Sequence, residues 1–188
     1  MRLPSILLAA VSGLAVSELA VAGDIENLAE QCRDCHRTDL SRGVLPLLDG
    51  QHAAYLEAQL LRFRESHREG FPMESIAADL DEARILALAE HFAAQPVARH
   101  VGSTRKALID HGRERAEALA CGECHGPAFE GGGAIARLGN QAPQYLEAQL
   151  QGIREGRRYH PPTAIGARIA DLDDTDLRAL AHFISSND

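Results

Sequence analysis

All four cysteines of the chain fall into two copies of one five-residue pattern, Cys-x-x-Cys-His. The copies are residues 32–36 (Cys-Arg-Asp-Cys-His) and residues 121–125 (Cys-Gly-Glu-Cys-His). In this pattern each thiol can add to a vinyl group of haem to form a thioether, and the histidine that follows places an imidazole next to the iron. The motifs predict two covalently bound haem c groups, attached at Cys32, Cys35, Cys121 and Cys124, with His36 and His125 as proximal iron ligands.

Four cysteines could also form a zinc site, two disulfides or redox-active dithiols. A four-cysteine zinc site does not require a histidine after each pair, and a thioredoxin-like dithiol is expected next to a βαβ pattern, which the sequence lacks. A disulfide framework is typical of shorter, loop-rich secreted chains. The doubled motif, which leaves no cysteine over, favours haem attachment over all three.

The N-terminal segment is similar to a secretory signal peptide. Arg2 gives a positive start, residues 3–16 are largely apolar, and Ala20-Val21-Ala22 offers a small-x-small cleavage site before Gly23. The apolar run is shorter than the roughly 20 apolar residues that a membrane-spanning helix needs. We expect a signal peptide over residues 1–22, export to the periplasm and no transmembrane segment in the mature chain. An uncleaved membrane anchor is the alternative.

The charge of the chain is acidic, with 19 Lys and Arg against 27 Asp and Glu and a formal charge of −8. Loss of a signal peptide would leave this balance unchanged, because it would remove one basic and one acidic residue, Arg2 and Glu18. Such a chain has little affinity for nucleic acid, so we expect no nucleic-acid partner. The acidity keeps the protein soluble and could steer encounters with a basic patch on a redox partner.

An internal repeat divides the chain into two units. Residues 55–60 (Tyr-Leu-Glu-Ala-Gln-Leu) recur unchanged at residues 145–150, an offset of 90, and the two cysteine motifs are offset by 89. Units of about 80 residues are too long for a solenoid and suit two small domains. The segment 96–103 holds Pro, Gly and polar residues without apolar periodicity, as a linker would. The predicted organisation is a signal peptide over 1–22, a first domain over 23–95, a linker over 96–103 and a second domain over 104–188.

Each unit is expected to be helical. Apolar residues recur at intervals of three and four, and strand-like alternation is absent. Asp81 and Asp173 stand where they can cap the last helix of each unit. The predicted fold class is all-α, with the haems supplying much of the apolar surface against which the helices pack. The expected helices are residues 24–31, 53–65 and 81–94 in the first unit and 104–120, 143–155 and 173–185 in the second.

Together these features resemble the dihaem cytochrome c4 family. The resemblance rests on the two haem motifs, the turns at 48–51 (Leu-Asp-Gly-Gln) and 138–141 (Leu-Gly-Asn-Gln), the repeated Tyr-Leu-Glu-Ala-Gln-Leu helix and the closing Leu-Ala helix, and it covers nearly all of the chain after residue 22. It implies a tandem duplication of the class I cytochrome c fold, with two domains in a pseudo-twofold arrangement. It also implies electron exchange with periplasmic or membrane-bound redox proteins, such as a cytochrome oxidase, a cytochrome bc complex or a sulfur-oxidising enzyme.

The distal iron ligands are expected to differ between the two units. Met73 matches the distal methionine of the family, and its thioether raises a haem potential relative to bis-histidine ligation. When Leu172 is aligned with Leu80, Ile165 falls at the position of Met73, and no methionine other than Met1 and Met73 exists in the chain. The second haem is therefore not expected to have His/Met ligation.

His160 is the candidate distal ligand of the second haem. The distal loop of the second unit, residues 157–165, carries two extra residues, and His160 lies among them. A bis-histidine haem would have a lower potential than the first. A five-coordinate or water-bound iron, or another side chain such as Lys106, remains an alternative. Six-coordinate irons in both units indicate an electron carrier, our leading interpretation, whereas an open second iron would indicate a redox enzyme, an enzyme subunit or a small-ligand sensor.

Overall fold

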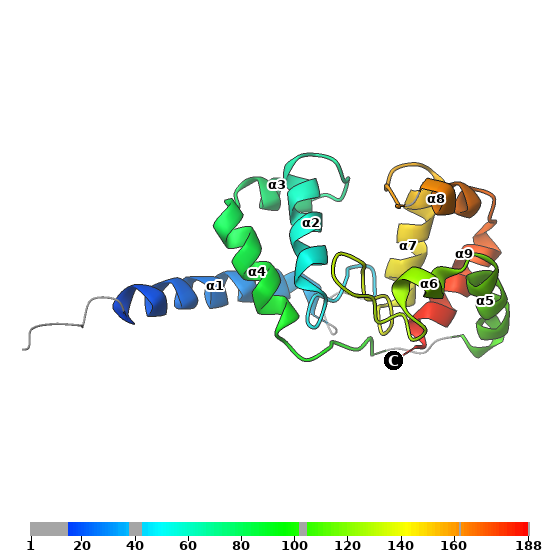
Figure 1. Ribbon diagram of the computed structural model, residues 1–188, viewed down its shortest axis with the longest axis horizontal. Coiled ribbons are helices and arrows are strands. Elements are labelled where there is room, and N and C mark those ends of the chain that lie inside the picture. Colours follow the sequence, from blue (N-terminus) through cyan, green and yellow to red (C-terminus); the bar gives the residue numbers. More distant parts are fainter. Residues whose placement is uncertain (1–14, 38–42, 102–104, 162, 188) are drawn as a thin grey trace, which may run out of the picture.

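The computed structural model describes residues 15–37, 43–101, 105–161 and 163–187, and the predicted all-α class is confirmed within them. These residues form nine helices and no β-strand. Figure 1 shows two helical lobes next to each other, the first lobe built from α1 to α4 and the second lobe from α5 to α9. The expected signal peptide lies outside the described residues over 1–14, and the expected linker lies outside them over 102–103.

The first lobe contains the first cysteine motif at the end of its first helix. Its helices are α1 (Ala15–His36), α2 (Ala53–Arg64), α3 (Met73–Ala78) and α4 (Glu82–Ala93). Helix α4 packs against both α1 and α2, and α2 also packs against α3. Helix α1 begins at Ala15 and not at the expected residue 24, and it includes the whole cysteine motif.

The second lobe repeats this arrangement with one local difference. Its helices are α5 (Lys106–Ala118), α6 (Cys121–His125), α7 (Pro143–Arg154), α8 (Thr163–Ala170) and α9 (Asp174–Ser185). The expected helix over 104–120 ends early because Ala120 adopts the left-handed conformation, with φ of 57°. A residue in that conformation interrupts the helical hydrogen bonds. The second cysteine motif therefore forms a separate helical turn.

One acidic residue caps the last helix of each lobe, as predicted. The Asp81 side chain accepts a hydrogen bond from the Arg84 backbone amide at 2.8 Å, and Asp173 accepts one from the Asp176 amide at 2.8 Å. Each cap satisfies a backbone donor that the first turn of a helix leaves free. The repeat therefore fixes where α4 and α9 begin.

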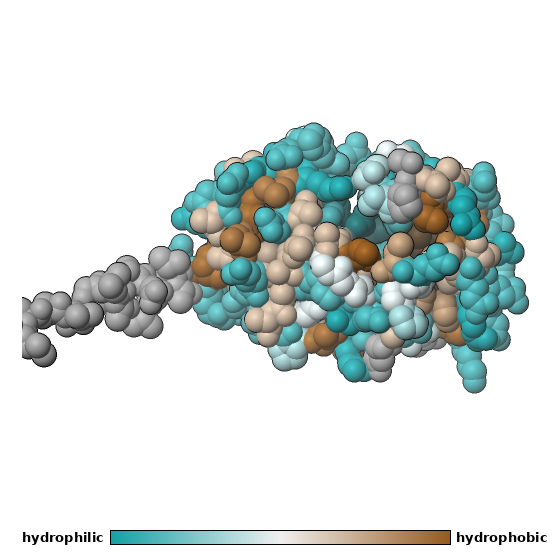
Figure 2. All heavy atoms as spheres, viewed as in Figure 1, coloured by the Kyte–Doolittle hydropathy of each residue, from teal (hydrophilic) through white to brown (hydrophobic). Residues whose placement is uncertain are grey.

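Each lobe has its own apolar core. The first core joins Leu56 of α2 with Ile85, Leu88 and Phe92 of α4. The second core joins Leu146 of α7 with residues of α9 that include Leu177, Leu180 and Ile184. On the face drawn in Figure 2, hydrophobic residues form small separate patches among hydrophilic ones. None of the described helices is long and apolar enough to cross a membrane.

Two reciprocal pairs of hydrogen bonds join the lobes. The Gln51 side chain donates to the Arg137 carbonyl at 2.9 Å and accepts from the Arg137 amide at 2.8 Å. The Gln141 side chain makes the same two bonds to Leu47, at 2.7 and 3.0 Å. Both glutamines are buried. Because each pair maps onto the other by the offset of 90, these bonds express the pseudo-twofold relation between the lobes.

Gly112 allows α5 and α9 to approach closely. A Cβ atom at this position would lie 2.1 Å from the carbonyl oxygen of Ala179 and 2.6 Å from the Cβ of Phe183. Neither atom can move unless the helices separate. We expect Gly112→Ala to lower the free energy of unfolding by about 3 kcal/mol, measured by denaturant titration.

Gly152, a buried helical glycine in α7, provides the matched control. A Cβ atom there would lie 3.6 Å from its nearest neighbour, the Cβ of Arg158. Gly152→Ala should change the free energy of unfolding by no more than about 1 kcal/mol. Equal losses in the two variants would show that the crossing at Gly112 is not closely packed.

Candidate haem sites

The four cysteines are free thiols, one pair in each lobe. Cys32 and Cys121 are half-buried against the two cores, whereas Cys35 and Cys124 are exposed. Burial raises the pKa of the Cys32 and Cys121 thiols. Among the described residues, no group of three or more His, Cys, Asp or Glu side chains could hold a metal ion. The geometry therefore assembles neither a disulfide nor a four-cysteine zinc site, and it leaves every thiol available for a thioether.

The two histidines expected to be proximal ligands are oriented in the same way. His36 Nδ1 lies 2.9 Å from the Pro46 carbonyl oxygen, and His125 Nδ1 lies 2.9 Å from that of Ala136. A carbonyl only accepts hydrogen bonds, so Nδ1 carries the proton in both rings and Nε2 keeps a free lone pair for iron. Burial also lowers the pKa of both histidines, which favours the neutral imidazole that a metal requires. These residues fit a haem iron.

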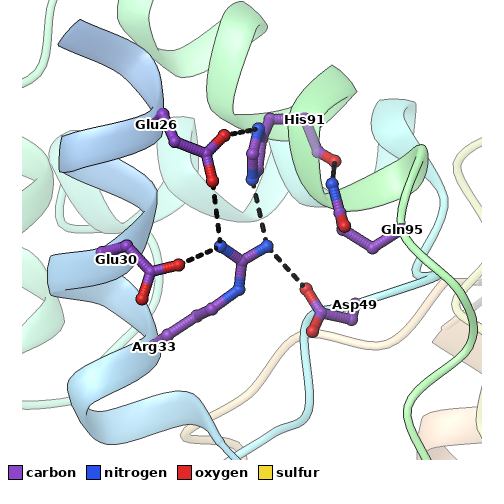
Figure 3. Close-up of polar contacts among 6 residues, drawn as sticks. All are labelled: Glu26, Glu30, Arg33, Asp49, His91 and Gln95. Carbon is purple, nitrogen blue, oxygen red and sulfur yellow. Dashed lines mark hydrogen bonds and ion pairs between the residues drawn. The ribbon is translucent and has the colours of Figure 1, made fainter. Parts of the chain in front are cut away.

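The first cysteine motif is also held by a polar network around Arg33, shown in Figure 3. The Arg33 guanidinium lies 2.7 Å from Glu30, 3.4 Å from Asp49 and 3.0 Å from His91 Nε2. It also lies 5.2 Å from the centre of the Phe92 ring. The network ties α1 to α4 and to the turn before α2. In the second motif the corresponding residue is Gly122, so only the first motif has this anchor.

The alignment of Ile165 with Met73 agrees with the structure. Leu80 closes α3 by donating to the Ala77 carbonyl at 3.1 Å, and Leu172 closes α8 by donating to the Ile169 carbonyl at 3.1 Å. Counting back from these equivalent turns places Ile165 where α3 has Met73. Met73 is half-buried at the first position of α3, whereas Ile165 packs against the second core. A side chain of carbon and hydrogen has no lone pair for iron.

His160 lies opposite His125 in the second lobe. The ring centres are 6.2 Å apart and the ring planes are inclined by 45°. His160 Nδ1 is buried and has no hydrogen-bond partner among the residues that the structure describes. Burial, with smaller effects of His125 and Arg158, lowers the pKa of His160, so the ring is neutral. His160 therefore lies close to His125, the expected proximal ligand, in a form able to bind iron.

The pair of residues that includes His160 differs between the lobes. The offset of 90 that pairs Arg68 with Arg158 pairs His160 with Gly70, so, contrary to the expectation, His160 is not one of the two extra residues of its loop. A Cβ atom at Gly70 would lie only 2.7 Å from the Phe63 ring. In the second lobe Ile153 stands at the position of Phe63. Isoleucine has no ring to meet a side chain at position 160, as the Phe63 ring would meet one at position 70. The contact between positions 63 and 70 is visible only in the structure.

Five other histidines have partners that explain them without iron. The contacts are His52 with the Glu130 carbonyl, His67 with Glu65, His91 with Arg33 and Glu26, His111 with Asp176, and His182 with the Arg105 amide. Lys106, the other alternative ligand, is exposed at the start of α5. These observations favour His160 over the five histidines and Lys106.

His182 should make the stability of the second lobe depend on pH. Its Nδ1 accepts a hydrogen bond from the Arg105 amide at 3.1 Å, and the residue is buried. Burial, then Arg105 and Arg178 against the opposing effect of Glu147, lowers the pKa of His182. Because the unfolded chain then binds more protons than the folded one, the free energy of unfolding falls as the pH drops below about 6.5.

A His182→Gln variant should show a shallower fall, because its amide oxygen can accept the same bond without titrating. Urea titrations between about pH 7 and about pH 5 would measure both slopes. The same slope in the variant and the wild type would remove His182 as the source.

Three arginines that contact residues of the opposite lobe were not predicted from the sequence. Arg158 donates to the Tyr55 hydroxyl at 2.9 Å, and Arg68 donates to the Tyr145 hydroxyl at 3.3 Å. Arg62 lies 5.3 Å from the centre of the Tyr159 ring. Tyr55 and Tyr145 therefore both lie where the two lobes meet. In both units an arginine follows the tyrosine at the same spacing, Arg68 after Tyr55 and Arg158 after Tyr145. This repeat was the signal that could have revealed the first two.

Comparisons with known proteins agree with this architecture. The cytochrome c family profile matches residues 109–188. Cytochrome c-552 of Acidithiobacillus ferridurans is 31% identical over 85% of this chain and 74% of its own length. A thiosulfate dehydrogenase electron acceptor of Stutzerimonas stutzeri is 32% identical, with 95% and 93% covered. Cytochrome c4 of Thiocapsa roseopersicina is 30% identical, with 75% and 78% covered.

Solved protein structures are also similar to this chain. Cytochrome c4 of Acidithiobacillus ferrooxidans superposes with a TM-score of 0.75 at 28% identity, over 84% of this chain and 99% of that one. Thiosulfate dehydrogenase (TsdBA) of Marichromatium purpuratum gives a TM-score of 0.70 at 32% identity, over 84% of this chain and 36% of that one. With two class I cytochrome c domains, two covalently bound haem c groups and a role in electron transfer, the chain belongs to the cytochrome c4 family.

Proposed function

We propose that the protein is a periplasmic electron carrier whose haems differ in their distal ligands. The first haem has His36 and Met73, and the second has His125 and His160. The observation that carries this proposal is the 6.2 Å between the centres of the His125 and His160 rings. An iron bonded at about 2 Å to one nitrogen of each ring, with each ring centre about 1 Å behind its nitrogen, separates the centres by about 6 Å.

The two ligand sets give the carrier a direction. Haem supplies a one-electron iron couple when bound. The Met73 thioether favours the reduced state more than the His160 imidazole does, so an electron comes to rest in the first lobe. In both lobes the carbonyl that accepts from Nδ1 makes the proximal imidazole a stronger ligand. The difference between the lobes therefore arises on the distal side.

Binding of carbon monoxide to the reduced protein separates a carrier from an enzyme or sensor. In a carrier with both irons six-coordinate, Met73 and His160 block the gas, and binding is slow at both haems. Rapid binding at one haem of the wild-type protein would contradict the proposal and would favour a small-ligand enzyme or sensor.

We propose a sulfur-oxidising enzyme as the electron donor. Support comes from the relative of Stutzerimonas stutzeri, which is named a thiosulfate dehydrogenase electron acceptor, and from the thiosulfate dehydrogenase structure that contains a similar portion. The test is to mix the oxidised protein with a thiosulfate dehydrogenase and thiosulfate. We expect both haems to be reduced within the turnover time of the enzyme. Reduction no faster than without the enzyme would exclude this donor.

We also propose that the chain is exported to the periplasm after cleavage behind Ala22. Support comes from the signal-like composition of residues 1–22 and from the thioether attachment that the two motifs provide. N-terminal sequencing of the haem-loaded protein from its native host should begin at Gly23. A chain that begins at Met1 and stays with the membrane fraction would show an uncleaved anchor.

A further inference from the structure

The loop that carries His160 is in contact with the other lobe at two neighbouring residues. Arg158 donates to the Tyr55 hydroxyl at 2.9 Å, and Tyr159 lies with its ring 5.3 Å from the Arg62 guanidinium. Tyr55 and Arg62 both belong to α2 of the first lobe. They are seven residues apart and therefore lie on the same side of the helix. One face of α2 thus contacts Arg158 and Tyr159, the two residues that precede His160.

Within the second lobe Arg158 has several partners, whereas Tyr159 is largely exposed. The Arg158 amide donates to the Gly152 carbonyl at 3.0 Å, and its guanidinium donates to Gln149. Tyr159, by contrast, has 54% of its surface exposed, and nothing lies within 4 Å of a Cβ atom at Gly156. The contact with Arg62 of α2 is therefore a large part of what fixes the Tyr159 ring, next to His160.

The contacts are not fully repeated on the other side of the pseudo-twofold axis. The bond between Arg158 and Tyr55 has a counterpart in the bond between Arg68 and Tyr145. The contact between Arg62 and Tyr159 has none, because the corresponding residues are Gly152 and Glu69. The additional contact is on the side where the distal loop differs from its repeat.

We propose that Tyr55 and Arg62 are positioning residues for His160, so that the first lobe holds the distal ligand of the second iron in place. The inference rests on the proposed ligation by His160. It makes that ligation depend on the docking of the two lobes. A change that separates α2 from the loop would free His160 and open the second iron, although both residues lie outside the second lobe.

Carbon monoxide binding to the reduced full-length holoprotein tests this role, since its rate at the second haem is limited by departure of the distal imidazole. We expect Tyr55→Phe, which removes one hydroxyl, to raise this rate about tenfold. Arg62→Gln should raise it about threefold, and Arg62→Lys, which keeps the positive charge, should stay near the wild-type rate. The rate at the first haem should not change.

Arg64→Gln is the matched control. Arg64 is on the same helix, but its guanidinium pairs with Glu82 of the first lobe at 3.7 Å. This variant should bind carbon monoxide at the wild-type rate. Thermal denaturation of all variants would identify any general loss of structure, which would accelerate binding at both haems.

The outcomes distinguish the positioning role of Tyr55 and Arg62 from the ligation of iron by His160. If His160→Ala opens the second haem while Tyr55→Phe and Arg62→Gln keep the wild-type rate, the positioning role is wrong and ligation by His160 stands. If His160→Ala leaves the spectrum unchanged, the ligation itself is wrong and the positioning role is wrong with it. A faster rate at the second haem alone in both α2 variants would support the positioning role.

Discussion

Replacing His160 with alanine is expected to convert one of the two haems from a low-spin, six-coordinate centre into a high-spin centre that binds carbon monoxide. His160 is half-buried with its Nδ1 atom shielded from solvent, and its ring centre lies 6.2 Å from that of His125. No methionine can replace it, because Ile165 occupies the position of Met73. Half of the low-spin signal should therefore disappear from the spectrum of the oxidised protein.

His67 offers a control in the distal loop of the first lobe. Its side chain is 71% exposed and its ion pair is with Glu65. His67→Ala should leave both haems low-spin. Added imidazole should restore the low-spin signal of His160→Ala, because it can enter the space that the side chain leaves. An unchanged spectrum in His160→Ala would remove this residue as a ligand and would return Lys106 or an open iron to consideration.

Replacing Met73 with alanine is expected to remove the high-potential step of the protein. Met73 is the sole methionine after residue 1, and it stands at the start of α3. Loss of the thioether should lower the potential of the first haem by about 100 mV or more, since axial ligands tune haem potentials over several hundred millivolts. A potentiometric titration followed by absorbance would show the shift. The low-potential step of the second haem should stay in place.

Ile165→Leu is the control at the corresponding position of the second lobe. Ile165 packs against the second core, and leucine keeps its volume and its lack of a donor atom. Neither potential should change in this variant. If Met73→Ala kept both wild-type potentials, the assignment of Met73 as the distal ligand of the first haem would be wrong.

Local patterns in the sequence predicted the longer helices but not α3, α6 or α8. Apolar periodicity located the longer helices, and Asp81 and Asp173 cap α4 and α9 as expected. These signals depend on residues within a few positions of one another, so a single sequence reveals them, whereas the short helices at the second haem motif and in the distal loops carry no such signal. The ligand roles of Met73 and His160 stay predictions until the variants are measured.

Features that depend on distant residues could not be predicted in the same way. The break between α5 and α6 lies at Ala120, in the left-handed conformation, and neither glycine nor proline marks this position in the sequence. The contacts of Tyr55 and Arg62 with the loop of His160 join residues about a hundred positions apart. The replacement of Phe63 by Ile153 at equivalent positions of the two lobes can be interpreted only when Gly70 and His160 are known to be equivalent as well. Long-range packing thus determines the distal side of the second haem.

A spectroelectrochemical titration of the wild-type protein, with near-infrared magnetic circular dichroism of the oxidised state, tests unequal ligation most directly. We expect two separate one-electron steps, a higher one from a haem with a methionine signature and a lower one from a haem with a bis-histidine signature. Two steps at similar high potential, both with methionine signatures, would contradict the assignment of Ile165 and His160.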